Sequence, residues 1–294
     1  MMDFETAWSL YRRAETRLPP RPPTTDPVEV AGLVPLLDRY DAFVLDAWGV
    51  LNLGESPIPS ARGAFEALRR TGKPFVVLSN DASSDPEDGA ARHTRRGFPV
   101  TRAQMVYGVD LVPEALAAAG HAAGRCALVA DPDPPRVVAQ MGLRPVEEVH
   151  DPDALVVLST THLKDHTRET VERLLAARPL PVFVGNPDIV SPEPSGMAVE
   201  PGYLAHHWAE RLGARVHFLG KPFPATYARA LERLGQPDPS RVLCVGDTPH
   251  TDVLGGRAAG CATLLVGSGF LRGQDARQRC LESGLTPDYL AASL

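Results

Sequence analysis

The strongest constraint on the fold is an alternation of short, continuously apolar runs with longer amphipathic segments. The apolar runs are AFVLDA, PFVVLS, CALVA, ALVVLS, PVFVG, RVLCVGD and ATLLVG. Helix-like segments such as ARGAFEALRR, DHTRETVERLLAA and ATYARALERLG lie between most of them. A strand that is apolar at every position is covered on both faces, and helical connections between such strands are typical of parallel sheets. We therefore predict an α/β fold built on a parallel sheet.

The N-terminal segment departs from this alternation. Residues 3–18 predict an amphipathic helix, and residues 18–27, LPPRPPTTDP, are too rich in proline for regular structure. We predict a helical arm and a stiff linker over residues 1–27. The sequence does not decide whether Trp8 and Tyr11 pack on the rest of the chain or on a second subunit.

Charge and composition exclude several classes of protein. The chain of 294 residues has a formal net charge of -6, which argues against the basic surface of a nucleic-acid-binding protein. No apolar run approaches the ~18 residues of a membrane-spanning helix, and the N-terminus lacks the layout of a signal peptide. Of the four cysteines, Cys244 and Cys261 lie in apolar runs typical of a reduced protein. We expect a cytoplasmic protein that binds neither nucleic acid nor membrane.

Polar and charged residues follow the predicted strands. Ligands of parallel α/β sheets bind beyond the carboxyl ends of the strands. The residues at these ends are Asp46, Ser79, Asn80, Asn186, Asp188, Lys221, Asp247 and Asp252. This combination of carboxylates, a hydroxyl group and one lysine predicts a divalent cation beside a phosphate group.

The carboxylates suit Mg²⁺, which prefers oxygen ligands in octahedral geometry. In this interpretation Asp46, the backbone carbonyl of Trp48 and Asp247 bind the ion, and Asp252 orients a metal-bound water without binding the ion itself. Asp46 attacks phosphorus and forms an aspartyl-phosphate, which water then hydrolyses.

The remaining polar residues predict a phosphate site. Lys221, Ser79 and Asn80, together with the backbone N–H of Ala47, are candidates for contacts with phosphate oxygens. Lys221 is one of only three lysines, whereas the other 27 basic residues are arginine. Lysine is a flexible point charge that arginine does not replace, and so its retention in a GKP turn supports a specific role.

Four segments resemble the motifs of a known family. LDAWGVL, VLSN, GKP and VGDTPHTD are similar, in this order, to the four motifs of the haloacid dehalogenase (HAD) superfamily. FVGNPD and EPGYL resemble its class IIA branch of nitrophenylphosphatase-like and sugar-phosphatase-like enzymes. The resemblance implies a Rossmann-like parallel-sheet core over residues 28–119 and 215–294. It also implies a large α/β cap over residues 120–214, inserted between the second and third motifs.

The same resemblance implies roles for individual residues. It makes Asp46 the nucleophile, Ser79 and Lys221 phosphate ligands, and Asp247 a metal ligand with Asp252 beside it. The implied activity is a phosphatase that depends on Mg²⁺.

Trp48 departs from the family pattern, in a DxWGV form that resembles a subgroup of class IIA. Most phosphatases of the family carry a second aspartate at this position, which protonates the leaving oxygen. The indole N–H is only a hydrogen-bond donor, and general acid–base help is typically worth ~10²–10⁴-fold in rate.

Three alternatives follow from the missing aspartate. Another group replaces the aspartate, with Asp81, an Asn52-bound water and His166 as candidates. Otherwise the substrate has a good leaving group, such as an acyl or aryl phosphate, or the chain binds a phosphorylated ligand with little turnover.

We expect a hydrolase that acts on a small phosphorylated metabolite and forms a homodimer. The alternative is a regulatory protein that binds a phosphorylated ligand. Asn186 and Asp188 are candidates for contacts with the substrate, and for Asp188 the alternative is a local turn after Pro187.

Overall fold

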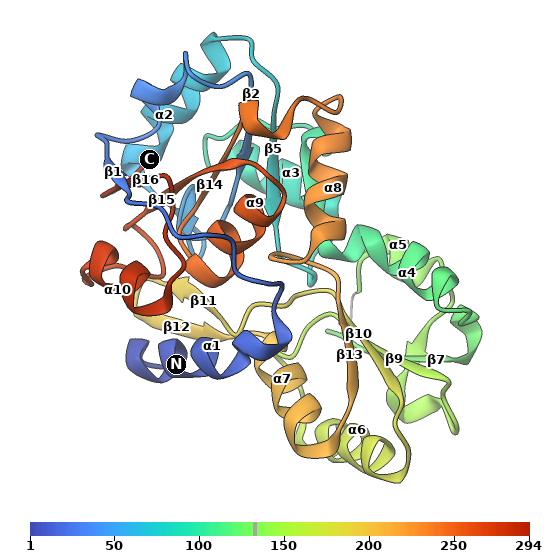
Figure 1. The fold of residues 1–294 in the computed structure, drawn as a ribbon. Coiled ribbons are helices and arrows are strands. Elements are labelled where there is room, and N and C mark those ends of the chain that lie inside the picture. The colour runs from blue at the N-terminus through green and yellow to red at the C-terminus, as the bar shows by residue number, and fades with distance from the viewer. Residues whose placement is uncertain (132–133) are drawn as a thin grey trace.

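The computed structural model describes residues 1–131 and 134–294, which form two α/β units side by side (Figure 1). The larger unit is built on a seven-stranded sheet in which all neighbouring strands are parallel. In spatial order, its strands are β1 (Val28–Glu29), β16 (Tyr289–Ala291), β15 (Ala262–Val266), β14 (Val242–Gly246), β2 (Ala42–Leu45), β5 (Phe75–Ser79) and β6 (Met105–Tyr107). The predicted α/β fold on a parallel sheet is confirmed.

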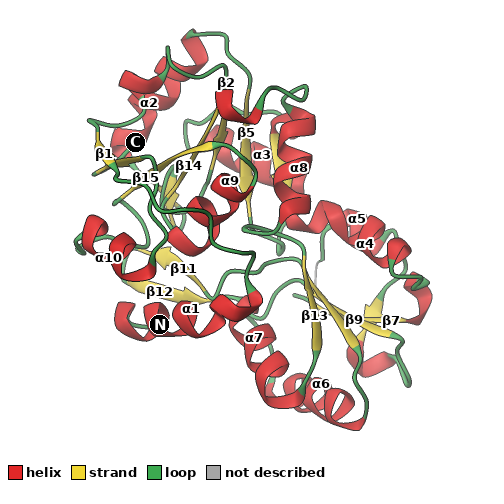
Figure 2. Cartoon of the chain, in the orientation of Figure 1, coloured by secondary structure: helices red, strands yellow, loops and turns green. Residues whose placement is uncertain are grey.

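Helices cover both faces of this sheet (Figure 2). α2 (Pro59–Arg70) packs on the face that carries Phe43, and α8 (Pro224–Arg233) packs on the face that carries Val44. Successive side chains of a strand point to opposite faces, and so β2 is buried at every position, as its apolar run predicts. The remaining helices of this unit are α3 (Pro86–Arg95), α4 (Val112–Ala118), α9 (Leu254–Ala258) and α10 (Ala276–Ser283).

The smaller unit is built on a five-stranded parallel sheet. In spatial order, its strands are β13 (Arg215–Phe218), β10 (Pro181–Val184), β9 (Ala154–Val157), β7 (Cys126–Val129) and β8 (Arg144–Pro145). α6 (Asp165–Ala177) and α7 (Pro201–Leu212) pack on one face around the buried Trp208. α5 (Arg136–Ala139) and α4 lie on the other face, where they continue the core of the larger unit.

The predicted return to the larger unit at residue 215 is wrong. β13 pairs with β10, from Arg215 opposite Pro181 to Phe218 opposite Val184, and therefore belongs to the five-stranded sheet. The short run RVHF buries only Phe218 fully, and nothing in so weak a pattern indicates which strand is its partner. The chain crosses back after β13, and Lys221 lies at this crossing.

Smaller elements lie between the two units. α1 (Phe4–Ala14) buries Trp8 and Tyr11 in a core that it shares with the rest of the same chain. It lies beside the antiparallel hairpin of β11 (Val190–Glu193) and β12 (Gly196–Val199). A second short hairpin, β3 (Asn52–Leu53) with β4 (Ser56–Pro57), follows β2. Within residues 1–131 and 134–294, no helix is both long and apolar enough to cross a membrane.

The packing of the larger sheet generates a stability prediction. Leu243 of β14 is fully buried, whereas Leu281 of α10 is 61% exposed. Leu243→Ala leaves a cavity, and we expect it to lower the free energy of unfolding by about 2–5 kcal/mol. The matched control Leu281→Ala is expected to change it by less than about 0.5 kcal/mol. Urea unfolding followed by circular dichroism measures both variants, and equal effects would contradict this account of the core.

Candidate active site

The site is built where two central strands end. Leu45 of β2 lies beside Val245 of β14, and the backbone N–H of Asp46 donates to the carbonyl of Val245 at 2.8 Å. Because the two strands are parallel and in register, Asp46 and Asp247 leave the sheet at the same edge. Ser79 ends β5 on the other side of β2, and its side chain lines the same cavity. The arrangement is the one that strand ends of a parallel sheet produce.

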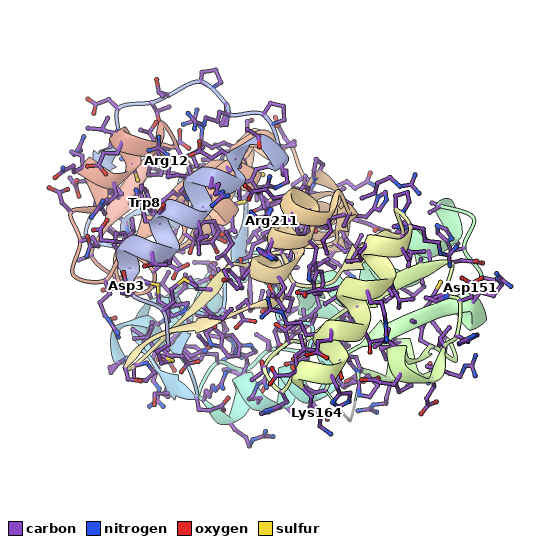
Figure 3. The ribbon with its side chains drawn as sticks, turned by 90° about the horizontal axis from the view of Figure 1, so that it is seen from below. Asp3, Trp8, Arg12, Asp151, Lys164 and Arg211 are labelled. Carbon is purple, nitrogen blue, oxygen red and sulfur yellow. The ribbon has the colours of Figure 1, made fainter. Side chains whose placement is uncertain are left out.

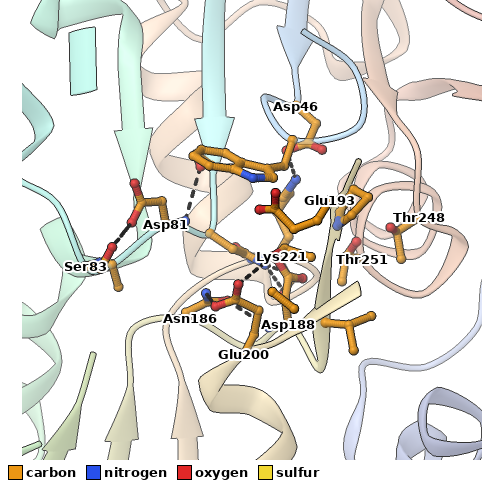
Figure 4. A pocket seen from close by; sticks show the side chains of 18 of the residues that line it. Asp46, Asp81, Ser83, Asn186, Asp188, Glu193, Glu200, Lys221, Thr248 and Thr251 are labelled. Carbon is orange, nitrogen blue, oxygen red and sulfur yellow. Dashed lines mark hydrogen bonds and ion pairs between the residues drawn. The ribbon is translucent and has the colours of Figure 1, made fainter. Parts of the chain in front are cut away.

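Three carboxylates meet at this edge. Ligand oxygens of Asp46, Asp247 and Asp252 all lie within 4.8 Å of one another, and all three residues are buried. The Nζ of Lys221 donates to Asp46 Oδ1 at 2.5 Å (Figure 4). It also donates to Asp252 Oδ1 at 2.7 Å. Lys221 therefore faces the acidic cluster, as its place in the sequence predicts.

The cluster holds more negative than positive charge. Burial raises the pKa of Asp46 well above its usual value, and the ammonium of Lys221 opposes this shift only in part. Burial, followed by the charge of Asp252, raises the pKa of Asp247 to about 7. Burial lowers the pKa of Lys221, but the two carboxylates that it contacts outweigh this effect and keep it charged. One ammonium does not balance three carboxylates, and a divalent cation with oxygen ligands fits this donor set.

Asp252 is held in place from two sides. Besides its contact with Lys221, its Oδ2 accepts hydrogen bonds from the backbone N–H groups of Asp247 at 3.3 Å and Thr248 at 3.1 Å. It lies in a π-helical turn, η8 (Pro249–Val253), which is separated from β14 by Asp247 and Thr248. The turn directs the Asp252 side chain back toward the residues that follow β14.

Two glycine-containing loops enclose Asp247. Gly49 has a φ of 84°, and a Cβ atom at this position would overlap the Asp247 carboxylate. The backbone N–H of Phe270 donates to Asp247 Oδ2 at 2.6 Å, and Ser268 Oγ donates to the carbonyl of Gly49 at 2.7 Å. The loop after β15 is therefore part of the site. Sequence reasoning missed this loop, because its contact with Asp247 is made by a backbone N–H group, which no residue type marks.

Asn80 connects the site to the smaller unit. Its Oδ1 accepts from the backbone N–H of Lys221 at 2.7 Å, and its Nδ2 donates to Asp188 Oδ1 at 2.9 Å. The turn after Pro187 uses the side chain of Asn186, whose Oδ1 accepts from the N–H of Asp188 at 3.0 Å. The Asp188 carboxylate is thus free of that turn and lines the cavity together with Asn186.

The cavity between the units has a volume of ≈ 320 Å³. Its far wall carries Glu200, which sequence reasoning missed and which accepts from Asn186 Nδ2 at 2.9 Å and from Ser191 Oγ at 2.6 Å. Burial raises the pKa of Glu200 to about 8, and burial raises that of Asp188 to about 6. Glu193, on the β11–β12 hairpin, also lines the cavity (Figure 4). These polar groups line the same cavity as Asp46 and Lys221.

Trp48 lines the cavity beside Asp46. The guanidinium groups of Arg92 and Arg96 lie 5.6 and 5.4 Å from the centre of its ring, within the range of cation–π contacts. Their spacing by four residues, from α3 to the residue after its end, was the available signal for this pair, but the sequence did not indicate that Trp48 was its partner. The two arginines of the larger unit therefore hold the indole ring of Trp48 in the cavity wall.

The three candidates for a replacement acid or base differ in position. The carboxylate of Asp81 lies in the cavity wall, but Arg92 contacts it at 2.7 Å and two serine hydroxyls donate to it. Although burial raises the pKa of Asp81, Arg92 and these hydroxyls outweigh that effect and hold it below its usual value. His166 is paired with Glu147 at 3.7 Å, and neither His166 nor Asn52 is among the described residues that line the cavity. Asp81 is an acceptor rather than an acid.

Comparison with known proteins gives consistent results. Residues 43–144 match the family model of haloacid dehalogenase-like hydrolases, and residues 218–294 match a second model of HAD-hydrolase-like proteins. The D-glycerol 3-phosphate phosphatase of Mycobacterium tuberculosis is 30% identical over 245 residues, which cover 82% of this chain and 67% of the relative. The acid sugar phosphatase of Staphylococcus aureus is 25% identical over 254 residues, covering 83% and 92%.

Solved structures extend the comparison. A possible sugar phosphatase of the HAD superfamily from Cytophaga hutchinsonii superposes with a TM-score of 0.78 at 26% identity, covering 90% of this chain and 98% of that one. The glycerol phosphate phosphatase of M. tuberculosis, solved with calcium, gives 0.66 at 25% identity, covering 80% and 68%; another of its structures holds magnesium. The predicted resemblance to class IIA proteins is confirmed. The chain belongs to the haloacid dehalogenase-like hydrolase family.

Proposed function

We propose that this protein is a phosphatase that hydrolyses a small phosphate monoester through an aspartyl-phosphate on Asp46. The observation that carries the proposal is the contact of Lys221 with Asp46 and Asp252 beside Asp247, at the floor of a cavity that two units enclose. The phosphatases named above, which are similar over most of the chain, support the same activity.

The residues at the floor divide the work between them. The Lys221 ammonium, Ser79 Oγ, Asn80 and the backbone N–H of Ala47 bind the phosphate oxygens. One carboxylate oxygen of Asp46 attacks phosphorus in line, and the bond from phosphorus to the ester oxygen breaks. Water then attacks the phosphorus of the aspartyl-phosphate, which releases phosphate and restores the Asp46 carboxylate.

We propose Mg²⁺ as the cofactor. Asp46, the backbone carbonyl of Trp48 and Asp247 would hold the ion, with Asp252 beside them, and the excess of buried negative charge favours a divalent cation at this position. When bound, the ion reduces the repulsion between the Asp46 carboxylate and the anionic phosphate group.

The smaller unit acts in this proposal as the cap that binds the leaving group. Together with the β11–β12 hairpin, it lines the cavity mostly with groups that exchange hydrogen bonds with hydroxyls: Ser159, Thr161, Asn186, Asp188, Ser191, Glu193 and Glu200. Burial raises the pKa of Glu200 to about 8, and its two side-chain oxygens accept hydrogen bonds from Asn186 and Ser191. A small polyhydroxylated phosphate, such as a polyol or sugar phosphate, fits this wall. The glycerol phosphate and sugar phosphatases among the relatives support this class of substrate.

Trp48 favours a second candidate function. Without a carboxylic acid at this position, the leaving oxygen lacks the family's usual proton donor, and Asp81 is held as an ionised acceptor by Arg92. A chain with this site could bind phosphorylated ligands and turn them over slowly. The experiment on Asp46 distinguishes this regulatory role from catalysis.

Asp46→Asn tests the nucleophile. In the presence of Mg²⁺, we expect the wild-type protein to hydrolyse p-nitrophenyl phosphate and the variant to lose about 10³-fold or more of kcat, because an amide does not attack phosphorus efficiently. Asp41→Asn is the matched control, since Asp41 pairs with Arg241 on the surface, and its rate should equal that of wild type. A wild-type protein that binds phosphate esters without turnover would instead support the regulatory role.

Trp48→Asp tests the missing acid. We expect this variant to hydrolyse glycerol phosphate with a kcat about 10–100-fold above that of Trp48→Asn, because only the aspartate can protonate the alkoxide. Both variants lose the ring that Arg92 and Arg96 contact, and so the comparison isolates the proton. Equal loss of activity in both variants, with the fold intact by circular dichroism, would show that the indole itself is required.

Glu200→Gln tests the buried acid in the cap wall. The ordinary pKa of glutamate is 4.5 and the folded value is about 8, so that between these limits the unfolded chain binds fewer protons than the folded one. Stability is then lost as pH rises through this window, by up to about 1.4 kcal/mol per pH unit. We expect the free energy of unfolding of Glu200→Gln, relative to wild type, to increase by at least about 1 kcal/mol from pH 5 to pH 8.

The control for this measurement is Glu66→Gln on α2, where the side chain is 71% exposed. Urea unfolding at both pH values should give parallel curves for wild type and this control. A Glu200→Gln variant whose curve also runs parallel to wild type would contradict the raised pKa.

A further inference from the structure

The N-terminal arm lies against both units at once (Figure 3). Toward the larger unit, Arg12 donates to the carbonyl of Glu282 in α10 at 2.6 Å. Toward the smaller unit, Arg13 pairs with Glu210 and Arg17 Nε donates to His206 Nδ1 at 3.2 Å, both on α7. Because the arm contacts both units, it restrains the position of one unit relative to the other. This observation is independent of the four motifs, because the arm precedes all of them.

Tyr11 links two loops of the candidate active site. Its Oη accepts a hydrogen bond from the backbone N–H of Ile189 at 3.2 Å, and Ile189 directly follows Asp188 of the cavity wall. Its ring stacks on His250 with a centroid distance of 5.1 Å and an angle of 18° between the planes. His250 lies in the turn between Asp247 and Asp252. One side chain therefore contacts the substrate wall and the metal-ligand turn together.

The partners of the arm depend on it for burial. His250 is fully buried, Glu15 Oε1 of the arm lies 3.4 Å from its Nε2, and Trp8 meets its ring edge at 5.1 Å. Phe270, whose backbone N–H donates to Asp247, packs on Phe4 and Tyr11 at 5.4 Å each. Aromatic packing from the arm, together with the contact of Glu15 with His250, thus holds His250 and Phe270 beside Asp247.

The hairpin over the cavity is attached to the same arm. The backbone N–H of Met2 donates to the carbonyl of Met197 in β12 at 2.9 Å. From the larger unit, Arg272 donates to the carbonyl of Glu193 at 3.0 Å. The β11–β12 hairpin, which supplies Ser191 and Glu193 to the cavity wall, is thus held near its turn by the arm and by the larger unit.

We propose that Tyr11 is a positioning residue. Through it, the N-terminal arm fixes the cap wall at residues 188–189 relative to the metal-ligand turn of residues 247–252. This inference rests on the proposed phosphatase function for its kinetic consequence. The backbone of residues 188–189 is tied to the arm by the Tyr11 hydroxyl, and the turn of residues 247–252 is tied to it by the Tyr11 ring. Loss of the hydroxyl alone should free the wall and leave the chemistry at Asp46 in place.

The experiment compares Tyr11→Phe with Tyr40→Phe. Both remove one phenolic hydroxyl, but that of Tyr40 bonds to Tyr289 far from the cavity. For Tyr11→Phe we expect a KM for glycerol phosphate raised roughly 3–10-fold, the value of one hydrogen bond, with kcat within about twofold of wild type. The inhibition constant of inorganic phosphate, which occupies only the floor of the site, should be unchanged. Tyr40→Phe should resemble wild type in all three quantities.

Hydrogen–deuterium exchange provides a readout that does not depend on turnover. Peptides covering residues 189–199 should exchange faster in Tyr11→Phe than in wild type and in Tyr40→Phe. Exchange equal to that of Tyr40→Phe would overturn the proposal, and so would faster exchange with an unchanged KM, because the hydroxyl would then be structural only. Absence of wild-type turnover would overturn the proposed function, while the exchange experiment would still decide whether Tyr11 holds the hairpin.

Discussion

The ion pairs of Lys221 are the contacts on which the rest of the site depends. Removing a carboxylate from water costs several kcal/mol, and the cost is repaid only by a nearby opposite charge and by hydrogen bonds. Lys221 supplies that charge to Asp46 and Asp252 at once. The lysine follows a strand of the five-stranded sheet, whereas the carboxylates follow strands of the seven-stranded sheet. The same contact therefore compensates charge and joins the two units.

The joint between the units is polar near the floor and apolar at its edge. Asn80, which follows a strand of the seven-stranded sheet, bonds to the backbone of Lys221 and to Asp188, which both follow strands of the five-stranded sheet. Further out, the aromatic side chains of α1 pack on His250 and Phe270. Hydrogen bonds are directional and fix individual atoms, whereas aromatic packing excludes water and keeps the loops together. Asn80 thus positions individual side chains of the site, whereas the aromatic residues of α1 shield its loops from water.

Much of the fold was predictable, because apolar runs and intervening helices report burial locally. β2, β5, β7, β9, β10, β14 and β15 each coincide with an apolar run. The pairing of β13 was not predictable from its four residues, since the partner strand β10 is separated from it by the hairpin and α7. The surface on which α1 packs was also not predictable from the sequence. Its amphipathic pattern indicates that one face is buried, but a pattern carries no information about the covering surface.

The sequence by itself determined the residue types at the strand ends, and the order of the motifs was enough to nominate Asp46, Ser79, Lys221 and Asp247. Strand ends converge in any parallel sheet, and so these assignments needed no coordinates. Only the tertiary structure decided that Glu200 faces the same cavity, that Arg92 and Arg96 contact Trp48, and that Tyr11 touches both loops. The physical reason is that burial and periodicity are encoded in neighbouring residues, whereas a contact between distant segments exists only once the whole chain has packed.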